Sequence, residues 1–564
     1  MKRWVSIGSG ALLMFAFTAC HLGDLTDLEV VNQNNPDRER ALTSAGDIES
    51  LISSGYFLWH RAVYQYEGNT LSSMGDEGSS SWGNYGSREM SSEPRVAWPN
   101  SPSFSYNNAT EYPWYRNYEA LSSVYDGLKA VEADPSLCAE FDCDRAHAFA
   151  KFVQGLSLGY LGLQFDKGFI LDESVDLETD SLPFYNYPDL ISKAVSYMEA
   201  AISEASGATW SLPTEWIRGN AWSSAELVRY IHAHIARLLY QEAREPAEHA
   251  AADWPAIIAH VNAGITQDVF LAGDIDEVWW QALNYFGNQI NDGTWHRADY
   301  KSIGWTSIDN GYANWLAASL NDRNDFVLNV ADERIHPPGA GDQDGLDFVF
   351  VGASQFPASR GTYHYSMYMN SNYADYAEDE SSPMPQMLYV TQQLMKAEGL
   401  ARTGDLNGAA DIVDVTRVGR ANLSPANRTD LGTLLQQIWY EHLIENYYVC
   451  TGCAFFPRRG WQAESPTGPN HHFGLVEGTP LHFPIPGKEL ELLQLLNYTY
   501  GGVGGDVGGT LPGSGGASGV RPSVRVPARA VYAFNSMDDT REKLDYIHRL
   551  EKRPSRGVTN LVRH

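Results

Sequence analysis

The sequence predicts a mainly α-helical protein, in which tetratricopeptide-like helical hairpins stack into an α-α superhelix that carries long irregular loop insertions. Three observations support this fold class. Apolar residues recur at helical spacing over most of the chain, one segment has the turn of a tetratricopeptide-type hairpin, and two stretches, 68–113 and 270–380, lose the helical pattern. With 564 residues, of which 43% are hydrophobic, the chain can bury a large core.

The clearest hairpin is predicted between Pro383 and Arg420. Apolar residues recur every three or four positions on both sides of a Gly404-Asp405 break. Gly can adopt the left-handed conformation that ends a helix, Asp can cap the next helix, and the small Ala409 allows close approach. One such unit cannot bury its own apolar face, so the rest of the chain must supply neighbours. The apolar positions are Met387, Val390, Leu394, Ala397 and Ala401, then Ile412, Val413 and Thr416.

Further helices are predicted from the same spacing. One follows Asp47, a candidate N-cap, and two helices on either side of Cys138 and Cys143 are expected to form a second hairpin. A helix over 191–202 is expected to pair with one over 227–238, and another helix covers 435–447. His234 lies on an apolar face, which favours a core histidine. A metal site formed with His232 is not expected, because the two side chains point to different sides of the helix.

The two irregular stretches contain many aromatic residues. Loops this long are usually functional or disordered, and the aromatic content argues against disorder. Exposed Trp and Tyr rings suit carbohydrate or peptide binding, while the alternative is packing against the helical body. Two or three of seven candidates are expected to contact a ligand. These candidates are Trp82, Tyr85, Trp98, Trp295, Trp305, Tyr312 and Trp315.

The N-terminal residues predict export and a lipid anchor. Lys2 and Arg3 precede an apolar run, Trp4 to Phe17, that is too short for a comfortable membrane span. The run ends just before Cys20, as in a lipoprotein signal peptide that is cleaved before a cysteine carrying diacylglycerol and palmitate. Residues 1–19 are thus predicted to be a lipoprotein signal peptide. The alternative is an ordinary signal peptide with an incidental cysteine.

The remaining chain divides by composition. Residues 20–46 form a polar N-terminal tether, 47–500 form the helical body, and 501–520 form a Gly-rich linker. Residues 521–564 form a basic tail of unknown role, with ten Lys and Arg against five Asp and Glu. The whole chain has a net charge of −30, which argues against a nucleic-acid partner.

Four cysteines remain besides Cys20. In an oxidising compartment they are expected to form two local disulfides, Cys138–Cys143 and Cys450–Cys453, with a zinc site or a redox C-x-x-C pair as alternatives. No other metal or cofactor is expected. A weak calcium candidate is an acidic turn that lacks the bidentate Glu of an EF-hand and is more typical of a solvated loop. Its carboxylates are Asp342, Asp344 and Asp347.

Short motifs in a shared order resemble the SusD/RagB family of outer-membrane nutrient-binding lipoproteins. They span nearly all of residues 20–497. They are Cys20; Leu28-Glu29-Val30 to Asn35-Pro36; Asp332-Glu333-Arg334; Thr362 to Ser366; Ala397-Glu398 with Gly404-Asp405; and Pro484-Ile485-Pro486 before Glu489-Leu490.

This resemblance implies four tetratricopeptide-like helix pairs with irregular insertions. It also implies a lipid-anchored place in the outer membrane, facing the cell exterior. The partner that it implies is a SusC-like TonB-dependent transporter, on which the protein captures oligosaccharides or peptides. The segment Tyr447 to Arg459 departs from the family pattern, although Arg458 and Arg459 remain. That departure bears on the packing of this corner and is not expected to affect ligand binding.

The leading hypothesis is therefore a lipid-anchored binding protein that is not an enzyme. No G-x-S-x-G, H-E-x-x-H or phosphate-loop motif is present. Two hypotheses from other classes remain open. One is a secreted glycoside hydrolase with an aromatic-lined cleft, since paired carboxylates can hide among 70 acidic residues. The other is a peptide-binding or protein-scaffold helical-repeat protein.

Overall fold

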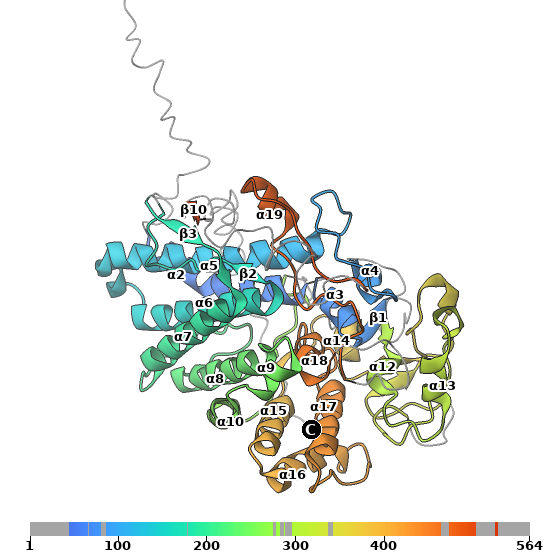
Figure 1. Cartoon of the computed structure of the whole chain (residues 1–564). Helices are drawn as coiled ribbons and strands as arrows, with labels where there is room; N and C mark the ends of the chain where they lie inside the picture. Colours follow the sequence, from blue (N-terminus) through green and yellow to red (C-terminus); the bar gives the residue numbers. More distant parts are fainter. Residues whose placement is uncertain are drawn as a thin grey trace, which may run out of the picture.

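Helices dominate the fold and confirm the predicted class (Figure 1). The computed structural model describes residues 44–65, 67–80, 86–177, 179–274, 278–281, 287, 296–336, 342–463, 473–503 and 525–527. Within these ranges, every helix is too short or too polar to cross a membrane. The predicted signal peptide, most of the tether and of the Gly-rich linker, and most of the basic tail lie outside the described residues.

Four antiparallel helix pairs form the body. The two helices of each pair pack together, the first helix contacts the first helix of the next pair, and the second helix also packs on that next helix. This is the stacking of tetratricopeptide repeats. Figure 1 shows the pairs following one another from α2 and α5 to α15 and α16, where α17 closes the series. The pairs are α2 (Ala45–Tyr64) with α5 (Asn108–Ala133), α6 (Cys143–Gln164) with α7 (Tyr187–Ala205), α8 (Ser224–Gln241) with α10 (Trp254–Ala263), and α15 (Tyr389–Arg402) with α16 (Leu406–Arg417), followed by α17 (Leu431–Glu445).

The pairing differs in part from the sequence prediction. The helices α5 and α6, predicted to form a hairpin, belong to neighbouring pairs, as do α7 and α8. The reason is that α2 reaches its partner α5 across the first insertion, which periodicity alone does not reveal. The starts of two helices also differ from the sequence prediction. The N-cap of α2 is Ser44, whose Oγ accepts from Asp47 N, and Met387 ends a strand before α15 begins.

The predicted turn at Gly404-Asp405 is confirmed. Gly404 has φ +101°, in the left-handed region, just beyond the end of α15. Asp405 is the N-cap of α16 and accepts a hydrogen bond from Gly408 N at 2.8 Å. Ala409 is fully buried against α15, so the two helices approach closely at this point.

Close approach also requires glycine on α6. A Cβ at Gly155 would lie 2.9 Å from the carbonyl oxygen of Ala194 on α7, which is backbone and cannot turn away. The second pair is therefore held together by main chains in near contact, and any larger residue at Gly155 would force the helices apart.

A buried carboxylate joins the third and fourth pairs. Tyr240 Oη and Trp439 Nε1 donate to one oxygen of Glu398, at 2.6 and 3.0 Å. His249 Nε2 and Arg402 Nε lie 2.9 and 2.8 Å from the other oxygen. Burial opposes ionisation, but His249 and Arg402 outweigh it and hold the pKa of Glu398 well below its usual range. One side chain of α15 thus ties α8 and α17 into the same core.

Sequence analysis predicted that the insertions are irregular throughout. Both insertions instead contain short helices and strands. The first holds α3, β1 and α4, and the second holds α12, α13 and α14 (Figure 1). The second also contains β6 and further short segments. Their bounds are α3 (Glu67–Met74), β1 (Gly78–Ser80), α4 (Ser87–Ser91), β5 (Val269–Leu271), β6 (His296–Ala298), α12 (Tyr300–Ile303), α13 (Gly311–Ala317), β7 (Phe348–Phe350), β8 (Tyr368–Asn370) and α14 (Ala374–Glu378).

Strands pair two at a time, always antiparallel: β1 with β6, β2 with β4, β3 with β10, β5 with β9 and β7 with β8. Strand β10 belongs to the predicted basic tail, and it pairs with β3, which lies between α6 and α7 in the sequence. Part of the tail therefore packs against the body. The remaining elements are β2 (Lys167–Gly168), β3 (Ser181–Pro183), β4 (Tyr185–Asn186), α9 (Pro246–Ala250), β9 (Met384–Met387), α18 (Phe455–Trp461), α19 (Gly487–Leu492), β10 (Arg525–Pro527) and the 3₁₀ turns Pro135–Ala139, Leu320–Asp322 and Ala358–Arg360.

Candidate functional site

The two insertions meet in the antiparallel ladder of β1 and β6. Gly78 pairs with Ala298, Ser79 with Arg297, and Ser80 with His296. The chain leaves β1 in the direction of Trp82 and Tyr85, and it enters β6 from Trp295. Because the strands are antiparallel, both connections lie at the same end of the ladder. The side chains of Trp82, Tyr85 and Trp295 lie outside the described residues.

Tyr448 packs directly against this ladder. A Cβ at Gly78 would overlap the Tyr448 hydroxyl, so only glycine fits there. Tyr448 Oη lies 3.2 Å from His296 Nδ1, and Tyr448 N donates to Glu77 Oε1 at 2.8 Å. Its φ of +54° is unusual for a residue with a side chain and carries strain of about 1–3 kcal/mol. A bulky ring is thus held in a strained conformation where it contacts both strands.

A disulfide-closed turn follows Tyr448. The two predicted bridges, Cys138–Cys143 and Cys450–Cys453, are both present, each with Cα atoms 5.3 Å apart. Within the second turn, Thr451 Oγ1 donates to Val63 O at the end of α2. Sequence analysis had separated this segment from the question of ligand binding. Tyr448 contacts β1 and β6, so this segment supports the ladder, and whether it affects ligand binding stays a prediction.

Two titratable groups at the ladder have shifted pKa values. Burial raises the pKa of Glu77 to about 7, although hydrogen bonds from Tyr448 N and Ser72 act in the opposite direction. Burial lowers the pKa of His296 to about 4, so this imidazole is neutral at neutral pH. Glu77, which directly precedes β1, therefore gains or loses its proton near neutral pH.

A buried ionic cluster around Lys301 joins the two insertions. Lys301 Nζ lies 2.6 Å from Asp76 Oδ1 and 3.0 Å from Glu93 Oε1. Arg95 is 2.9 Å from the same oxygen of Asp76, and Arg323 is 3.2 Å from Glu93. All five side chains are almost completely buried. A charge that is removed from water in this way needs a partner of opposite charge. The cluster therefore fixes one insertion against the other.

The motif from Thr362 to Ser366 belongs to the same corner. His364 Nε2 lies 3.1 Å from Glu93 Oε1. Arg297 Cζ lies 4.8 Å from the centre of the Tyr365 ring, and Arg297 Nη1 donates to Ser366 O at 2.9 Å. This motif therefore contacts β6 through Arg297, in addition to the pairing of β6 with β1.

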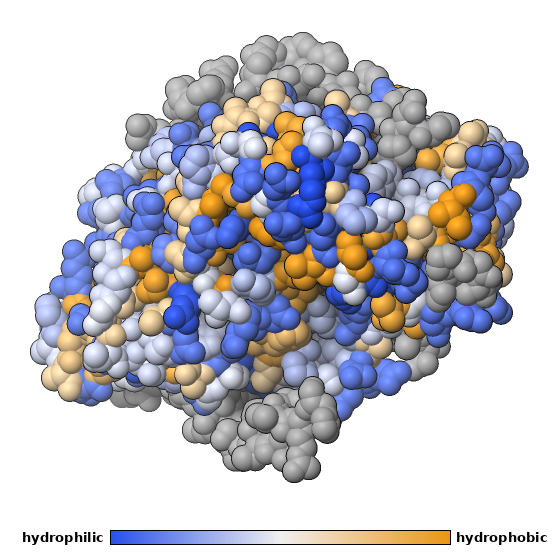
Figure 2. Space-filling view, turned by 90° about the horizontal axis from the view of Figure 1, so that it is seen from below, coloured by the Kyte–Doolittle hydropathy of each residue, from blue (hydrophilic) through white to orange (hydrophobic). Residues whose placement is uncertain are grey.

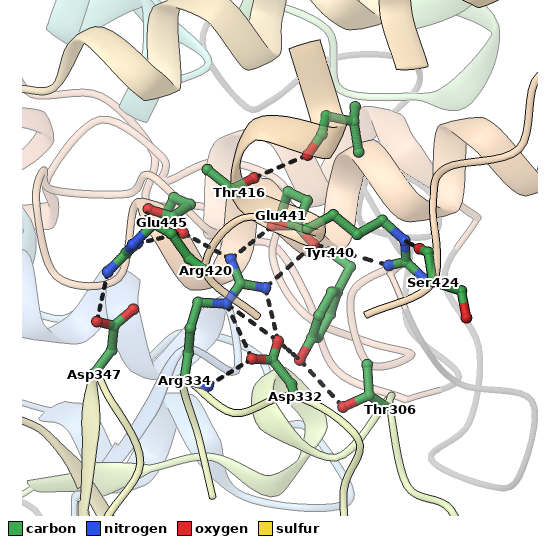
Figure 3. A network of polar contacts seen from close by, with 12 residues as sticks. Thr306, Asp332, Arg334, Asp347, Thr416, Arg420, Ser424, Tyr440, Glu441 and Glu445 are labelled. Atoms are coloured by element: carbon green, nitrogen blue, oxygen red, sulfur yellow. Dashed lines mark hydrogen bonds and ion pairs between the residues drawn. The ribbon is translucent and has the colours of Figure 1, made fainter. Parts of the chain in front are cut away.

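A second ionic network binds the second insertion to α17 (Figure 3). Arg334 Nη1 lies 2.6 Å from Glu441 and 2.7 Å from Glu445, and Arg334 Nη2 lies 2.7 Å from Asp332. Tyr440 Oη donates to Asp332 at 2.8 Å. The Asp332-Glu333-Arg334 motif thus packs as a buried structural network.

Both remaining arginines of the segment Tyr447 to Arg459 are buried. Arg459 Nη1 donates to Leu163 O at 3.0 Å, and Arg459 Nη2 donates to Gln241 O at 2.9 Å. These carbonyls lie at the C-terminal ends of α6 and α8, where helices leave acceptors unpaired. Arg458 Nη2 donates to Ser302 Oγ at 3.1 Å, in the second insertion.

Three of the predicted ligand-binding rings are core residues. Trp98, Tyr312 and Trp315 are only 1%, 5% and 5% exposed. Trp98 packs edge-on against Phe104, with ring centres 5.2 Å apart, and Tyr312 stacks on Trp315 at 6.2 Å. This burial corrects the prediction for these three, because their ring faces are covered by the protein itself. Composition could not separate them from surface rings.

Trp305 occupies an intermediate position. It is half-buried between Tyr440 and Phe473, with ring centres 5.0 and 5.3 Å away. Ligand contact by Trp305 stays a prediction, as it does for Trp82, Tyr85 and Trp295. Sequence analysis missed Tyr448, Glu77 and Lys301, and no spacing signal pointed to them.

The acidic turn proposed for calcium is used in other ways. Asp344 Oδ1 accepts from Phe350 N at 2.8 Å, and Asp347 Oδ1 lies 2.6 Å from Arg420 Nη2. Asp342 is exposed. Burial raises the pKa of Asp347 to about 6, although Arg420 acts in the opposite direction. Among the residues that the structure describes, no group of three or more His, Cys, Asp or Glu side chains could hold a metal ion.

On the face seen from below, hydrophobic residues form several small patches among hydrophilic ones (Figure 2). Hydrophobic and hydrophilic residues are therefore interspersed on the described part of this face.

Comparison with known proteins gives structural resemblance only. No family model matches the sequence, and no curated protein matches it. Similar solved structures include a SusD superfamily protein from Bacteroides vulgatus (14% identity, 80% of this chain and 97% of that chain, TM-score 0.47) and one from Bacteroides fragilis (16%, 80% and 98%, TM-score 0.49). Another, from Bacteroides vulgatus, is described as a SusD-like carbohydrate binding protein (12%, 74% and 83%, TM-score 0.46). These structures carry the family name that the sequence motifs indicated.

Proposed function

We propose that this chain is a lipid-anchored surface protein that binds oligosaccharides, or other nutrient oligomers, beside the β1–β6 ladder. The observation that supports the proposal best is the pairing of Ser80 with His296, which connects two aromatic-rich segments to one end of one ladder. Flat Trp and Tyr rings bind the apolar faces of sugars, and neighbouring Asn and Asp side chains bind hydroxyl groups. The buried ion pairs of Lys301 join the two insertions, which supports a site whose flanking strands keep one arrangement.

The proposal names Trp82, Tyr85 and Trp295 as the first ligand-binding candidates, with Trp305 as a further one. The test is a screen of polysaccharides and peptides by retardation in affinity gels, followed by calorimetry on those that bind. Replacing Trp82 and Trp295 with Ala should abolish retardation. The matched control is Trp210→Ala, which removes a half-buried Trp outside both insertions. Equal retardation of the double variant and the wild type would contradict the proposed site.

Two further parts of the proposal concern place and partner. We infer that residues 1–19 are removed and that Cys20 carries the lipid. Cys20→Ser should then release the protein from membranes and abolish labelling with palmitate. We also infer that the ligand passes to a SusC-like TonB-dependent transporter in the outer membrane, and co-purification from detergent-solubilised membranes tests that partner.

The two alternative functions give different results in the same screen. A secreted glycoside hydrolase would release reducing ends from the glycans that it retains. A helical-repeat scaffold that binds only protein would retain no glycan at all. No specific contact among the described residues favours either alternative over a binding protein without catalysis.

A further inference from the structure

Two histidines face each other across the third helix pair, far from the ladder in sequence. His232 lies on α8 and His260 lies in the last turn of α10, and their Nδ1 atoms are 2.9 Å apart. Both side chains are half-buried. In the absence of another ligand, one Nδ1 must donate a proton to the other. Two imidazole lone pairs can converge here on a cation once that proton moves to Nε2 of the same ring, which is the other neutral tautomer.

The spacing of the two nitrogens is close to that of a metal site. Zinc binds imidazole nitrogens at about 2.0–2.1 Å in tetrahedral geometry, which places two ligand nitrogens about 3.3 Å apart. The observed Nδ1–Nδ1 distance of 2.9 Å therefore needs to increase by only about 0.4 Å. Rotation of the half-buried rings can supply such a change.

The surroundings favour a cation with open coordination positions. A hollow of about 330 Å³ next to His232 is lined by the end of α7, by α8 and by the end of α10. Ala205, the last residue of α7, and Ala263, the last residue of α10, both border this hollow. Helix C-termini carry partial negative charge, which stabilises a positive ion. Arg229 is the charged group on the wall of the hollow and acts in the opposite direction.

The protonation states also suit ligation. Burial lowers the pKa of both imidazoles, and for His232 the neighbouring His260 adds to the effect. Both rings are therefore neutral at neutral pH, which is the form that binds metals. Imidazole nitrogens select zinc, copper or nickel over calcium or magnesium, which prefer oxygen ligands.

We propose that His232 and His260 bind a divalent transition-metal ion, of which Zn²⁺ is the probe, and that water or another exogenous group fills the remaining positions. The bound ion would join α8 to α10 and so strengthen the third helix pair. Sequence analysis considered His232 with His234 and found no site. The actual partner lies on the neighbouring helix, and His234 is buried among Trp59, Phe152 and Tyr230.

Calorimetric titration of the full chain with Zn²⁺ tests the proposal. His471 and His472 lie outside the described residues and are adjacent in sequence, so the reference protein carries His471→Asn and His472→Asn. This reference should still bind one Zn²⁺ per chain. Adding His232→Asn or His260→Asn should weaken that binding by at least about tenfold, since losing even an outer partner of a ligand has such an effect.

His147→Asn is the matched control, because His147 also pairs with a side chain on a neighbouring helix, Glu204, at 2.7 Å. It should leave Zn²⁺ binding unchanged. Zn²⁺ should raise the melting temperature of the reference protein and not that of the His260→Asn variant. Unchanged binding in both single variants, or no binding by the reference protein, would overturn the proposal and leave a histidine pair that shares one proton. Circular dichroism verifies that each variant is folded.

Discussion

At the scale of single residues, buried ionisable groups decide how the protein responds to pH. Glu77 shows this at the ladder, where burial raises its pKa to about 7 from a usual value of 4.5. The folded state therefore binds this proton more tightly than the unfolded state. The stabilisation is complete below pH 4.5 and is lost as the pH rises through about 7.

Glu77→Gln should remove this pH dependence. The amide can still accept from Tyr448 N but does not ionise. Between pH 4.5 and pH 7.5 the wild type should lose about 3 kcal/mol of unfolding free energy that the variant retains. Urea unfolding at several pH values measures this difference. Glu132→Gln, at an exposed site, should follow the wild type throughout. A Glu77→Gln variant with the same pH slope as the wild type would show that Glu77 is already ionised in the fold.

Trp305→Ala should separate packing from recognition. Because the ring is half-buried between Tyr440 and Phe473, its loss should cost less than the roughly 3–5 kcal/mol of a fully buried aromatic. If Trp305 contacts the ligand, the folded variant should bind a retained glycan more weakly. Circular dichroism and affinity gels measure the two effects. A folded variant with unchanged retardation would assign Trp305 to the core alone.

At the scale of elements, the four helix pairs depend on apolar faces that sequence analysis identified well. Leu394 on α15 is fully buried, whereas Val415 on α16 is 67% exposed. Leu394→Asp should unfold the body, because the free energy of burying an unpaired carboxylate in the core exceeds the usual unfolding free energy of a domain. Val415→Asp is the control and should change stability by no more than about 0.5 kcal/mol. Thermal unfolding followed by circular dichroism distinguishes the two, and a cooperative transition in Leu394→Asp near that of the wild type would contradict the burial of this face.

Glu398 stabilises the fold through polar contacts that join α15 to α8 and α17. Glu398→Ala should destabilise the protein by about 3–5 kcal/mol, since it leaves Arg402, His249, Tyr240 and Trp439 without their shared acceptor. The exposed Glu491→Ala on α19 should have little effect. In the wild type the contribution of Glu398 is present above pH 4.5 and is lost as the pH falls through its lowered pKa. Denaturant unfolding at pH 7 measures the loss.

The elements also show where prediction from sequence succeeds and fails. The hairpin at Gly404-Asp405 was predictable, because a left-handed Gly, an N-capping Asp and a small Ala act locally. The partner of α2 was not, because it follows a long insertion. Trp98, Tyr312 and Trp315 were misplaced because the composition of a loop does not tell which rings turn inward. Tyr448 and His260 act through contacts distant in sequence, which periodicity does not encode.

At the scale of the whole molecule, buried histidines and buried carboxyls set opposing pH limits. Burial lowers the pKa of His60 to about 3, and those of His296 and His442 to about 4. The stabilisation from these neutral rings is present above pH 6.5 and is lost as the pH falls. Glu77 and Glu489, with pKa values raised by burial to about 7 and about 8, weaken the fold as the pH rises.

The melting temperature should therefore be highest near pH 6.5 and fall on both sides. Below about pH 4.5 the carboxyls with raised pKa values, Glu77, Asp347 and Glu489, are protonated in both states and no longer oppose the histidines, so the decline on the acidic side should be steepest between pH 4.5 and pH 4. Scanning calorimetry in a buffer series of constant ionic strength measures the profile. His442→Asn should reduce the slope on the acidic side if it remains folded. A flat profile from pH 4 to pH 8 would contradict these assignments.

The β1–β6 ladder has a consequence for the order in which the protein folds. Its strands are more than 200 residues apart in the chain, and closing a loop of that length requires that the intervening segments first become compact. The helix pairs, which form through contacts closer in sequence, are expected to fold earlier, and the ladder afterwards. A protein released from synthesis with its helices already formed would then acquire the proposed binding site last, so functional maturation would lag behind the appearance of helical structure.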